Sequence, residues 1–234
     1  QALDRLAQAL AEIRQPAPDD ALSAATMTGE LADCVPTRQA GGRLDGAFFR
    51  HRIERALGLR RTIGLPRTAS GRETDAFRVV YGEGDGVPGL IIDRFADVVA
   101  VQLGTLGLRR REGQIYDAIQ AVLAPRAIVD RPGRKSVSEA SAKLEGFELT
   151  PGVVRGDAKL GELAFRERGF EFRIPLSIGQ KTGFYVDQRP LRARVEQLAR
   201  GRRVLDAYAF IGTFGLAAAR GGATEDLSVD ESPS

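Results

Sequence analysis

The sequence predicts a mixed fold, in which a small central α+β unit precedes the beginning of a doubly wound α/β sheet. Alternating apolar residues and glycine-containing turns dominate residues 76–176, which is the pattern of short antiparallel strands. Residues 202–230 instead follow the order strand, loop, helix, strand, which is that of a first βαβ unit. The composition of 43% hydrophobic and 28% charged residues is typical of a globular chain.

The amino-terminal part contains two helical patterns separated by an irregular stretch. Residues 1–15 place four aliphatic side chains on one helical face, whereas residues 16–42 are rich in Pro, Asp, Ser, Thr and Gly and predict a linker or irregular cap. Residues 47–65 predict a basic amphipathic helix, and residues 67–74 a loop. We therefore divide the chain into an amino-terminal segment (1–42), a basic helix with linker (43–75), a central α+β domain (76–176) and the start of the α/β domain (177–234).

The central domain is expected to have a strand-strand-helix-strand-strand character, with its strands set around one helix. The predicted strands and helix are 77–81, 89–93, 97–103, helix 107–124 and strand 127–132, with turns at GEGDGVP and RFAD. Residues 133–158 have loop composition, and residues 162–176 predict a hairpin that turns at Arg168-Gly169. Beyond them, the pattern predicts a helix at 189–201, a buried-type strand at 202–210, a loop and helix at 211–223 and a strand at 226–230.

Several classes of protein are disfavoured by simple counts. No apolar run approaches the ~20 residues of a membrane helix, and the first residues form an acid-containing amphipathic helix rather than a signal peptide. We therefore expect a cytoplasmic protein without a membrane partner. The single cysteine, Cys34, excludes an internal disulfide, and with one histidine, His51, it argues against a metal site.

Positive charge is concentrated after residue 42. Residues 1–42 hold three basic and six acidic residues, and the remainder holds 31 basic and 25 acidic. Arginine binds phosphate bidentately and stacks on bases, so RNA is a reasonable partner, although arginine used for ordinary surface charge explains the composition equally well. The candidate RNA-binding residues are Arg50, Arg52, Arg60, Arg61, Arg109, Arg110, Arg131, Arg134 and Lys135.

The βαβ pattern carries a candidate nucleoside site. One predicted strand reaches Asp206, a turn around Gly212 follows, and the next strand ends at Asp230, 24 residues after Asp206. Ligands bind at the carboxyl ends of parallel strands, and an acid at about this spacing accepts hydrogen bonds from ribose hydroxyls. Aromatic residues (Tyr208, Phe210, Phe214) occupy positions where a pyrophosphate loop has glycines, which favours S-adenosylmethionine (SAM), with Asp206 and Gly212 toward its methionine end. Acids that only cap a helix or lie on the surface would give the same spacing.

The stretch GQKTGFYVDQR (179–189), followed by VLDAYAFIGTFGLAAARGGA, resembles the signature GxKTGxYxDQR of bacterial SAM-dependent large-subunit rRNA methyltransferases of the cytosine-5 type. The resemblance extends to GEGDGVPGLIIDRFADVVAVQ, LEGFELTPG and FFRHRIERALGLR, and covers about residues 43–234. It implies a Rossmann-like class I SAM methyltransferase domain that begins in this chain, SAM as cofactor and large-subunit rRNA as partner. A homodimer is a partner that the sequence leaves open.

The resemblance assigns roles to the residues of this stretch. Those that match the family's cofactor-flanking segment are Gln180, Lys181, Thr182, Gly183, Tyr185, Asp187, Gln188 and Arg189. The segment is then expected to lie across the SAM pocket, with Lys181 near the methionine carboxylate or an RNA phosphate and with Asp187 and Arg189 bracing it. A structural connector whose polar groups satisfy one another is the alternative for any single residue.

The chain also departs from this family. Residues 1–42 show no convincing form of the small β-rich RNA-binding (PUA) domain with which the family begins, and neither the family's Asp-Pro-Pro segment nor its later catalytic cysteine is present. Attack of a thiolate on C6 is what makes cytosine C5 able to accept a methyl group.

We therefore place no catalytic residue in this chain and expect the catalytic residues beyond Ser234, its last residue. The chain is then expected to be an incomplete portion without methyl-transfer activity. A non-catalytic RNA-binding module, or a small-molecule methyltransferase of the same fold, are the alternative functions.

Overall fold

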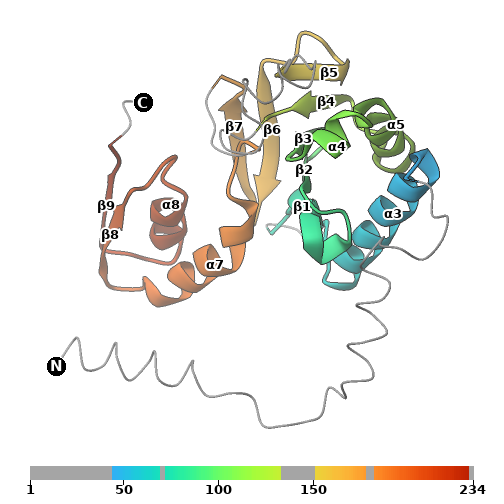
Figure 1. Ribbon diagram of the computed structural model, residues 1–234. Helices are drawn as coiled ribbons and strands as arrows, with labels where there is room; N and C mark the ends of the chain where they lie inside the picture. The colour runs from blue at the N-terminus through green and yellow to red at the C-terminus, as the bar shows by residue number, and fades with distance from the viewer. Residues whose placement is uncertain (1–43, 69–71, 133–150, 178–181, 232–234) are drawn as a thin grey trace, which may run out of the picture. The chain divides into compact units, whose positions relative to one another are not determined.

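The computed structural model describes residues 44–68, 72–132, 151–177 and 182–231, and residues 43–234 form one compact unit (Figure 1). The helix and linker predicted for residues 1–42 lie outside the described residues, as do Cys34, Ser234 and most of the loop predicted for 133–158. Within the described part of the chain, no helix has the length and apolar character needed to cross a membrane.

A five-stranded sheet forms the centre of this unit. Its strands in spatial order are β1 (Ala76–Tyr81), β2 (Leu90–Phe95), β3 (Val98–Leu103), β4 (Ala127–Asp130) and β5 (Gly152–Gly156). Neighbouring strands are antiparallel except β3 and β4, which run parallel. The helical segment between β3 and β4 accounts for the parallel pair, because a crossover connection returns the chain to the same end of the sheet.

Helices cover one face of the sheet. They are α3 (Gly46–Thr62), the single turn α4 (Leu106–Arg109) and α5 (Glu112–Leu123). Phe49 and Ile53 from α3 and Ile119 from α5 are buried in one core with β1, β2 and β3. The basic helix α3 therefore belongs to the central core, so the prediction of strands around one helix is wrong. The short apolar stripe of this helix did not show in the sequence which sheet it covers.

The β-hairpin covers the opposite face. It consists of β6 (Glu162–Glu167) and β7 (Phe170–Pro175), and its inward phenylalanines pack against Phe95 of β2, with the Phe95 and Phe165 ring centroids 5.1 Å apart. The turn predicted at Arg168-Gly169 is confirmed. Both residues have positive φ (53° and 83°), as a tight two-residue hairpin turn requires.

Three local predictions are wrong. β5 lies inside the stretch predicted as loop, because two glycines within five residues hide the strand pattern and only pairing with β4 creates it. Gly156 is required there, since a Cβ would lie 2.0 Å from the carbonyl oxygen of Arg126. The RFAD turn contracts to its last two residues because β2 continues to Phe95, and the helix predicted at 107–124 is divided into α4 and α5.

The carboxyl-terminal part has the predicted βαβ order. After the short 3-10 helix η2 (Val186–Gln188) come α7 (Arg189–Leu198), β8 (Arg203–Ala207), α8 (Thr213–Arg220) and β9 (Glu225–Val229), and β8 and β9 are parallel. Pro190 fits the first turn of α7, where a backbone N–H has no helical acceptor.

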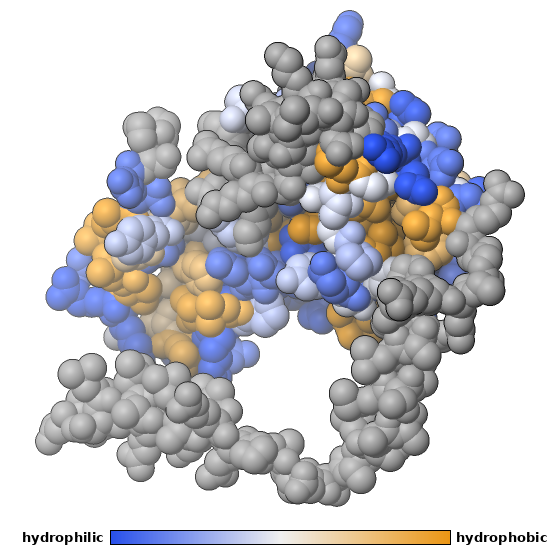
Figure 2. All heavy atoms as spheres, viewed as in Figure 1, coloured by the Kyte–Doolittle hydropathy of each residue, from blue (hydrophilic) through white to orange (hydrophobic). Residues whose placement is uncertain are grey.

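The prediction of a buried strand at 202–210 is wrong for the described residues. Asp206 is the one buried residue of β8, while Leu205 is 65% exposed and Leu227 of β9 56% exposed. Successive side chains alternate between faces, so Leu205 and Leu227 lie on the face opposite to α8. Figure 2 shows apolar side chains at the surface of this part of the molecule (left).

A buried ion pair holds α4 against the end of β4. The guanidinium of Arg109 binds the carboxylate of Asp130 through both of its Nη atoms, and the Tyr116 hydroxyl donates to the same carboxylate at 2.8 Å. Burial and the neighbouring Asp130 both raise the pKa of Tyr116, so the hydroxyl stays protonated and remains a donor.

We expect Asp130→Ala to lower the free energy of unfolding by about 3–5 kcal/mol, because it leaves the Arg109 charge buried without its partner. Urea denaturation measures this loss. The matched control is Asp97→Ala, which breaks the exposed Arg126–Asp97 pair and should cost less than about 1 kcal/mol. Similar losses in the two variants would contradict the assignment.

Candidate functional site

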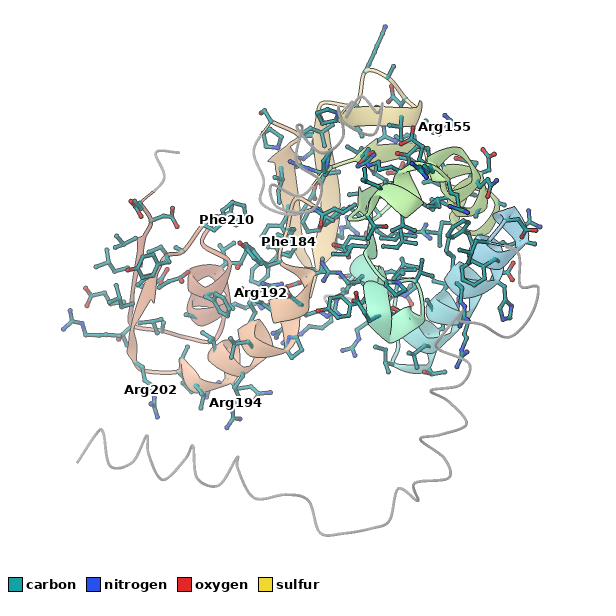
Figure 3. All side chains as sticks on the ribbon, in the orientation of Figure 1. Arg155, Phe184, Arg192, Arg194, Arg202 and Phe210 are labelled. Atoms are coloured by element: carbon teal, nitrogen blue, oxygen red, sulfur yellow. The ribbon has the colours of Figure 1, made fainter. Side chains whose placement is uncertain are left out.

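A cavity of about 630 Å³ lies where the motif before α7 meets the loop between β8 and α8. This is the size range of small-molecule sites. Its lining residues are Phe184, Tyr185, Gln188, Arg192, Tyr208, Ala209, Phe210, Thr213, Phe214, Asp230 and Glu231. Phe184, Arg192 and Phe210 lie near one another in Figure 3, from the motif, from α7 and from the β8–α8 loop. The cavity therefore lies at the carboxyl end of the parallel strands, as in other α/β sheets.

The β8–α8 loop has an unusual backbone that the end of β9 holds in place. Tyr208, Phe210 and Gly212 all have positive φ (60°, 55° and 67°), which is uncommon for the two aromatic residues. The amide of Phe210 donates to Oδ2 of Asp230 at 2.7 Å, and the amide of Ala209 donates to a backbone carbonyl of β9. Strained residues of this kind persist where their surroundings hold them, and they cluster at ligand sites.

Aromatic rings form two sides of the cavity. The rings of Tyr185 and Phe210 meet edge to face with centroids 5.8 Å apart, whereas Tyr208 is 84% exposed. Phe184 is buried beneath them, against the phenylalanines of the hairpin. A flat apolar group such as a purine can therefore pack against a surface built from aromatic rings of two different segments.

Carboxylates set the charge of the cavity. Asp230 and Glu231 line it, and the one lining cation is Arg192, which is buried against Glu167 with Nε–Oε1 and Nη2–Oε2 distances of 2.6 and 2.7 Å. The charge of Arg192 is thus balanced within the protein. Carboxylates in the lining suit a cationic ligand with hydroxyl groups and disfavour a phosphate.

Asp206 lies next to the cavity rather than in its lining. Its Oδ2 accepts the amide of Gly215 at 3.0 Å, in the first turn of α8. Burial raises the pKa of Asp206 and repulsion from Asp226 and Asp230 raises it further, against the opposing effect of this hydrogen bond. Asp206 therefore serves the helix terminus here, which is the alternative that the sequence left open.

The predicted cofactor residues separate into two groups. Tyr185, Tyr208, Phe214 and Asp230 come together at the cavity. Four others do not line it: Thr182, Gly183, Asp206 and Gly212. Gln180 and Lys181 lie outside the described residues.

Thr182 attaches the motif to the central sheet, and Gly183 packs it against the hairpin. The buried Thr182 hydroxyl donates to Oδ2 of Asp93 at 2.5 Å, and the guanidinium of Arg78 binds the same carboxylate bidentately. Gly183 has φ 133°, and a Cβ on it would lie 2.7 Å from Cδ1 of Leu163. The carbonyl oxygen of Ala76 accepts a hydrogen bond from Arg189, so Arg189 braces the segment as expected.

The described residues end at Glu231, whereas the catalytic residues are expected beyond Ser234. Residues 232–234 lie outside the described part of the chain, and Glu231 is the last residue that lines the cavity. The expectation that the catalytic residues follow Ser234 therefore stays a prediction.

Sequence reasoning did not select Arg192, Thr213 or Glu231 as site residues. Arg192 is one of several arginines on a basic helix, and no spacing distinguishes it from its neighbours. Glu231 directly follows Asp230, so it could have been found by extending the search past the ribose acid. Phe210, the last residue of the predicted strand 202–210, was named with Tyr208 and Phe214 but was not selected as a cofactor-binding residue.

The predicted RNA-binding residues occupy different environments. Arg50, Arg61 and Arg110 are exposed. Arg52 lies over the ring of Phe48, and Arg131 donates to the carbonyl of Leu176. Arg60 binds Asp85 bidentately and Arg109 binds Asp130, so these two are committed to internal contacts and are unsuited to RNA. Arg134 and Lys135 lie outside the described residues.

Comparison with known proteins finds a family that is similar to the part of the chain around the cavity. Residues 155–233 match the profile of S-adenosylmethionine-dependent methyltransferases. SAM is therefore the cofactor of the family whose sequence surrounds the cavity.

Relatives with similar sequences carry consistent names. The Ribosomal RNA large subunit methyltransferase of Deinococcus radiodurans is 42% identical over 193 residues, which are 80% of this chain and 45% of that protein. The Ribosomal RNA large subunit methyltransferase I of Erwinia tasmaniensis is 37% identical over 190 residues, with 81% and 45% covered. This chain thus spans about half the length of these relatives.

Solved structures support the fold. A candidate SAM-dependent methyltransferase from Streptococcus mutans matches with a TM-score of 0.66 at 21% identity, over 82% of this chain and 46% of that one. A second structure of a candidate methyltransferase, in complex with SAH, matches with a TM-score of 0.67, also at 21% identity and over the same shares. The class I methyltransferase fold assignment is confirmed.

The raised pKa of Asp206 predicts a pH effect on stability. A carboxyl group whose pKa is higher in the folded than in the unfolded state binds more protons when folded, so its contribution to stability falls as pH rises between the two pKa values. We expect Asp206→Asn, which keeps an acceptor for Gly215, to become more stable relative to the parent as pH rises from about 3 to above the raised pKa. Urea denaturation along a pH series tests this, and a pH-independent difference would contradict it.

Proposed function

We propose that this chain contributes the SAM-binding part of a methyltransferase that modifies C5 of a cytosine in large-subunit (23S) rRNA. The observation that carries the proposal is the cavity at the end of β8 and β9, where Asp230 both lines the cavity and holds the strained β8–α8 loop. In this proposal the ribose hydroxyls of SAM donate to Asp230.

The residues present fit this cofactor. The rings of Tyr185 and Phe210 are available for the adenine, with Tyr208 and Phe214 further along the cavity. SAM carries no phosphate and has a net positive charge, which matches a cavity lined by the carboxylates of Asp230 and Glu231. Gln180 and Lys181 remain expected cofactor neighbours through the motif alone.

Support for an rRNA cytosine comes from sequence likeness. The relatives are named large-subunit ribosomal RNA methyltransferases, and the motif at 179–189 resembles the cytosine-5 type. An rRNA substrate would place the whole enzyme in the cytoplasm. Whether two copies of the chain associate stays an open expectation.

We expect Asp230→Asn to weaken SAH binding by about tenfold, because a charged acceptor for the ribose hydroxyls becomes a neutral amide while one oxygen remains for the Phe210 amide. Isothermal titration calorimetry with SAH measures this. Glu225→Gln, on the strand that leads to Asp230, is the matched control, because Glu225 pairs with exposed Arg203 outside the cavity. Unchanged affinity in Asp230→Asn, or no SAH binding by the parent chain, would contradict the proposed site.

We expect no methyl transfer by this 234-residue chain alone. The proposed chemistry requires a thiolate next to the target base, and no cysteine is present among the residues that line the cavity. Incubation with 23S rRNA and SAM carrying a labelled methyl group tests this, with the Deinococcus radiodurans relative as positive control. Robust incorporation by the chain would contradict the expectation.

A further inference from the structure

A second cavity, of about 460 Å³, lies on the other side of α7. We call it the arginine pocket because four arginines line it: Arg67, Arg72, Arg168 and Arg189. The other lining residues are three polar ones (Thr74, Glu196 and Gln197) and four apolar ones (Ile63, Leu65, Pro190 and Ala193). None of these residues lines the cavity at the end of β8 and β9. The pocket is therefore a separate feature that the proposed SAM site does not explain.

The arginine pocket contains more positive than negative charge. Glu196 is the carboxylate in its lining, and it is bound by Arg72 (Nη1–Oε1 2.9 Å), by Arg168 and, from behind the pocket, by Arg220 (Nη2–Oε2 2.7 Å). One carboxylate thus faces several guanidinium groups. An anion bound here would reduce the repulsion among them.

The pKa shifts of Glu196 and Arg168 agree with an excess of positive charge in the pocket. Burial raises the pKa of Glu196, but hydrogen bonds from Arg220 and Arg72 lower it by more. The carboxylate is therefore ionised, and it is already bound by these arginines. Burial lowers the pKa of Arg168, and repulsion from Arg220 and Arg72 adds to this effect. Nη1 of Arg168 is buried and has no hydrogen-bond partner in the described part of the chain.

Two arginines at the entrance are available to a ligand. Arg67 is exposed, and its side chain makes no hydrogen bond or ion pair within the described residues. The Arg72 side chain is 48% exposed and uses one Nη atom for Glu196. The apolar side of the pocket includes Ile63, which is 63% exposed. Guanidinium groups beside an apolar wall match a nucleotide, whose phosphate is anionic and whose sugar and base are flat or weakly polar.

The position of the pocket relates it to the cofactor cavity. Arg189, Ala193, Glu196 and Gln197 are spaced by four, three and one residues and lie on one face of α7, whereas Arg192 lines the cavity on another face. An α-helix is about 10 Å wide, so a group in the pocket is held about one helix diameter from the cofactor.

We propose that the arginine pocket binds a backbone phosphate of the RNA substrate and so anchors the RNA beside the methyl donor. The inference rests on the proposed function, which supplies an RNA ligand. Acidic peptides are the competing ligand chemistry, since guanidinium groups also bind carboxylates.

The test is RNA binding by the parent chain and by the double variant Arg67→Ala/Arg72→Ala, with a fluorescein-labelled 30-nucleotide RNA stem-loop in fluorescence anisotropy over a salt series. We expect the variant to bind five- to twentyfold more weakly at 100 mM salt, with the slope of log affinity against log salt smaller by about one or two, since each phosphate contact contributes about 0.9.

The matched control is Arg194→Ala/Arg202→Ala, which removes the same charge from two exposed arginines that line neither cavity and that point away from Phe184 and Phe210 in Figure 3. It should lose less than about twofold. Equal losses in the two double variants, or tight binding of a polyglutamate peptide that competes with RNA, would overturn the proposal. So would an absence of RNA binding by the parent chain.

SAH titration separates this proposal from the proposed function. Both double variants should bind SAH as the parent chain does, because neither changes the SAM cavity. Loss of SAH binding in Arg67→Ala/Arg72→Ala would mean a damaged fold. The single variant Arg67→Ala, which removes a side chain without an internal hydrogen bond in the described residues, then tests the pocket: an unchanged slope of log RNA affinity against log salt would overturn the proposal. A parent chain that binds RNA through the pocket but binds no SAH would contradict the proposed function and leave the pocket standing.

Discussion

The buried ion pair between Arg192 of α7 and Glu167 of β6 connects the parts of the described unit. Both residues are 2% exposed, and Nη2 of Arg192 also donates to the carbonyl of Tyr185 at 3.0 Å. The guanidinium lies 4.8 Å from the ring centroid of Phe184. Loss of one partner of such a buried pair is strongly destabilising, so the hairpin, the motif before α7 and the wall of the cavity at the end of β8 and β9 depend on the same contact.

Helix α7 thereby acquires two different environments on its sides. One side, through Arg192, faces a cavity lined by the carboxylates of Asp230 and Glu231, and the other faces a pocket lined by four arginines and one carboxylate. A cationic nucleoside cofactor and an anionic polynucleotide would each meet the charge that suits it. Separation by one helix keeps the two ligands close without placing the RNA phosphates against the acids of the cofactor site.

The arginines show why composition alone was ambiguous. Arg60 and Arg109 balance buried or half-buried carboxylates, and Arg192 does the same at the hairpin, so part of the basic composition serves the fold. Other arginines, such as Arg67 and Arg61, are exposed and free to meet a ligand. Sequence spacing cannot separate the two classes, because the acids that pair with Arg60 and Arg109 are 25 and 21 residues away along the chain.

The sequence by itself determined the hairpin turn at Arg168-Gly169, the order of the βαβ unit and the identity of the acid, Asp230, at the cavity. These are local properties, set by residue periodicity, turn chemistry and spacing within one supersecondary unit. Only the tertiary structure decided that Thr182 binds Asp93 instead of lining the cavity, that residues 152–156 form a strand, and that Arg192 lies in the wall of the site. Each of these depends on partners far apart in the chain, whose approach is governed by the packing of whole elements and leaves no periodic trace in the sequence.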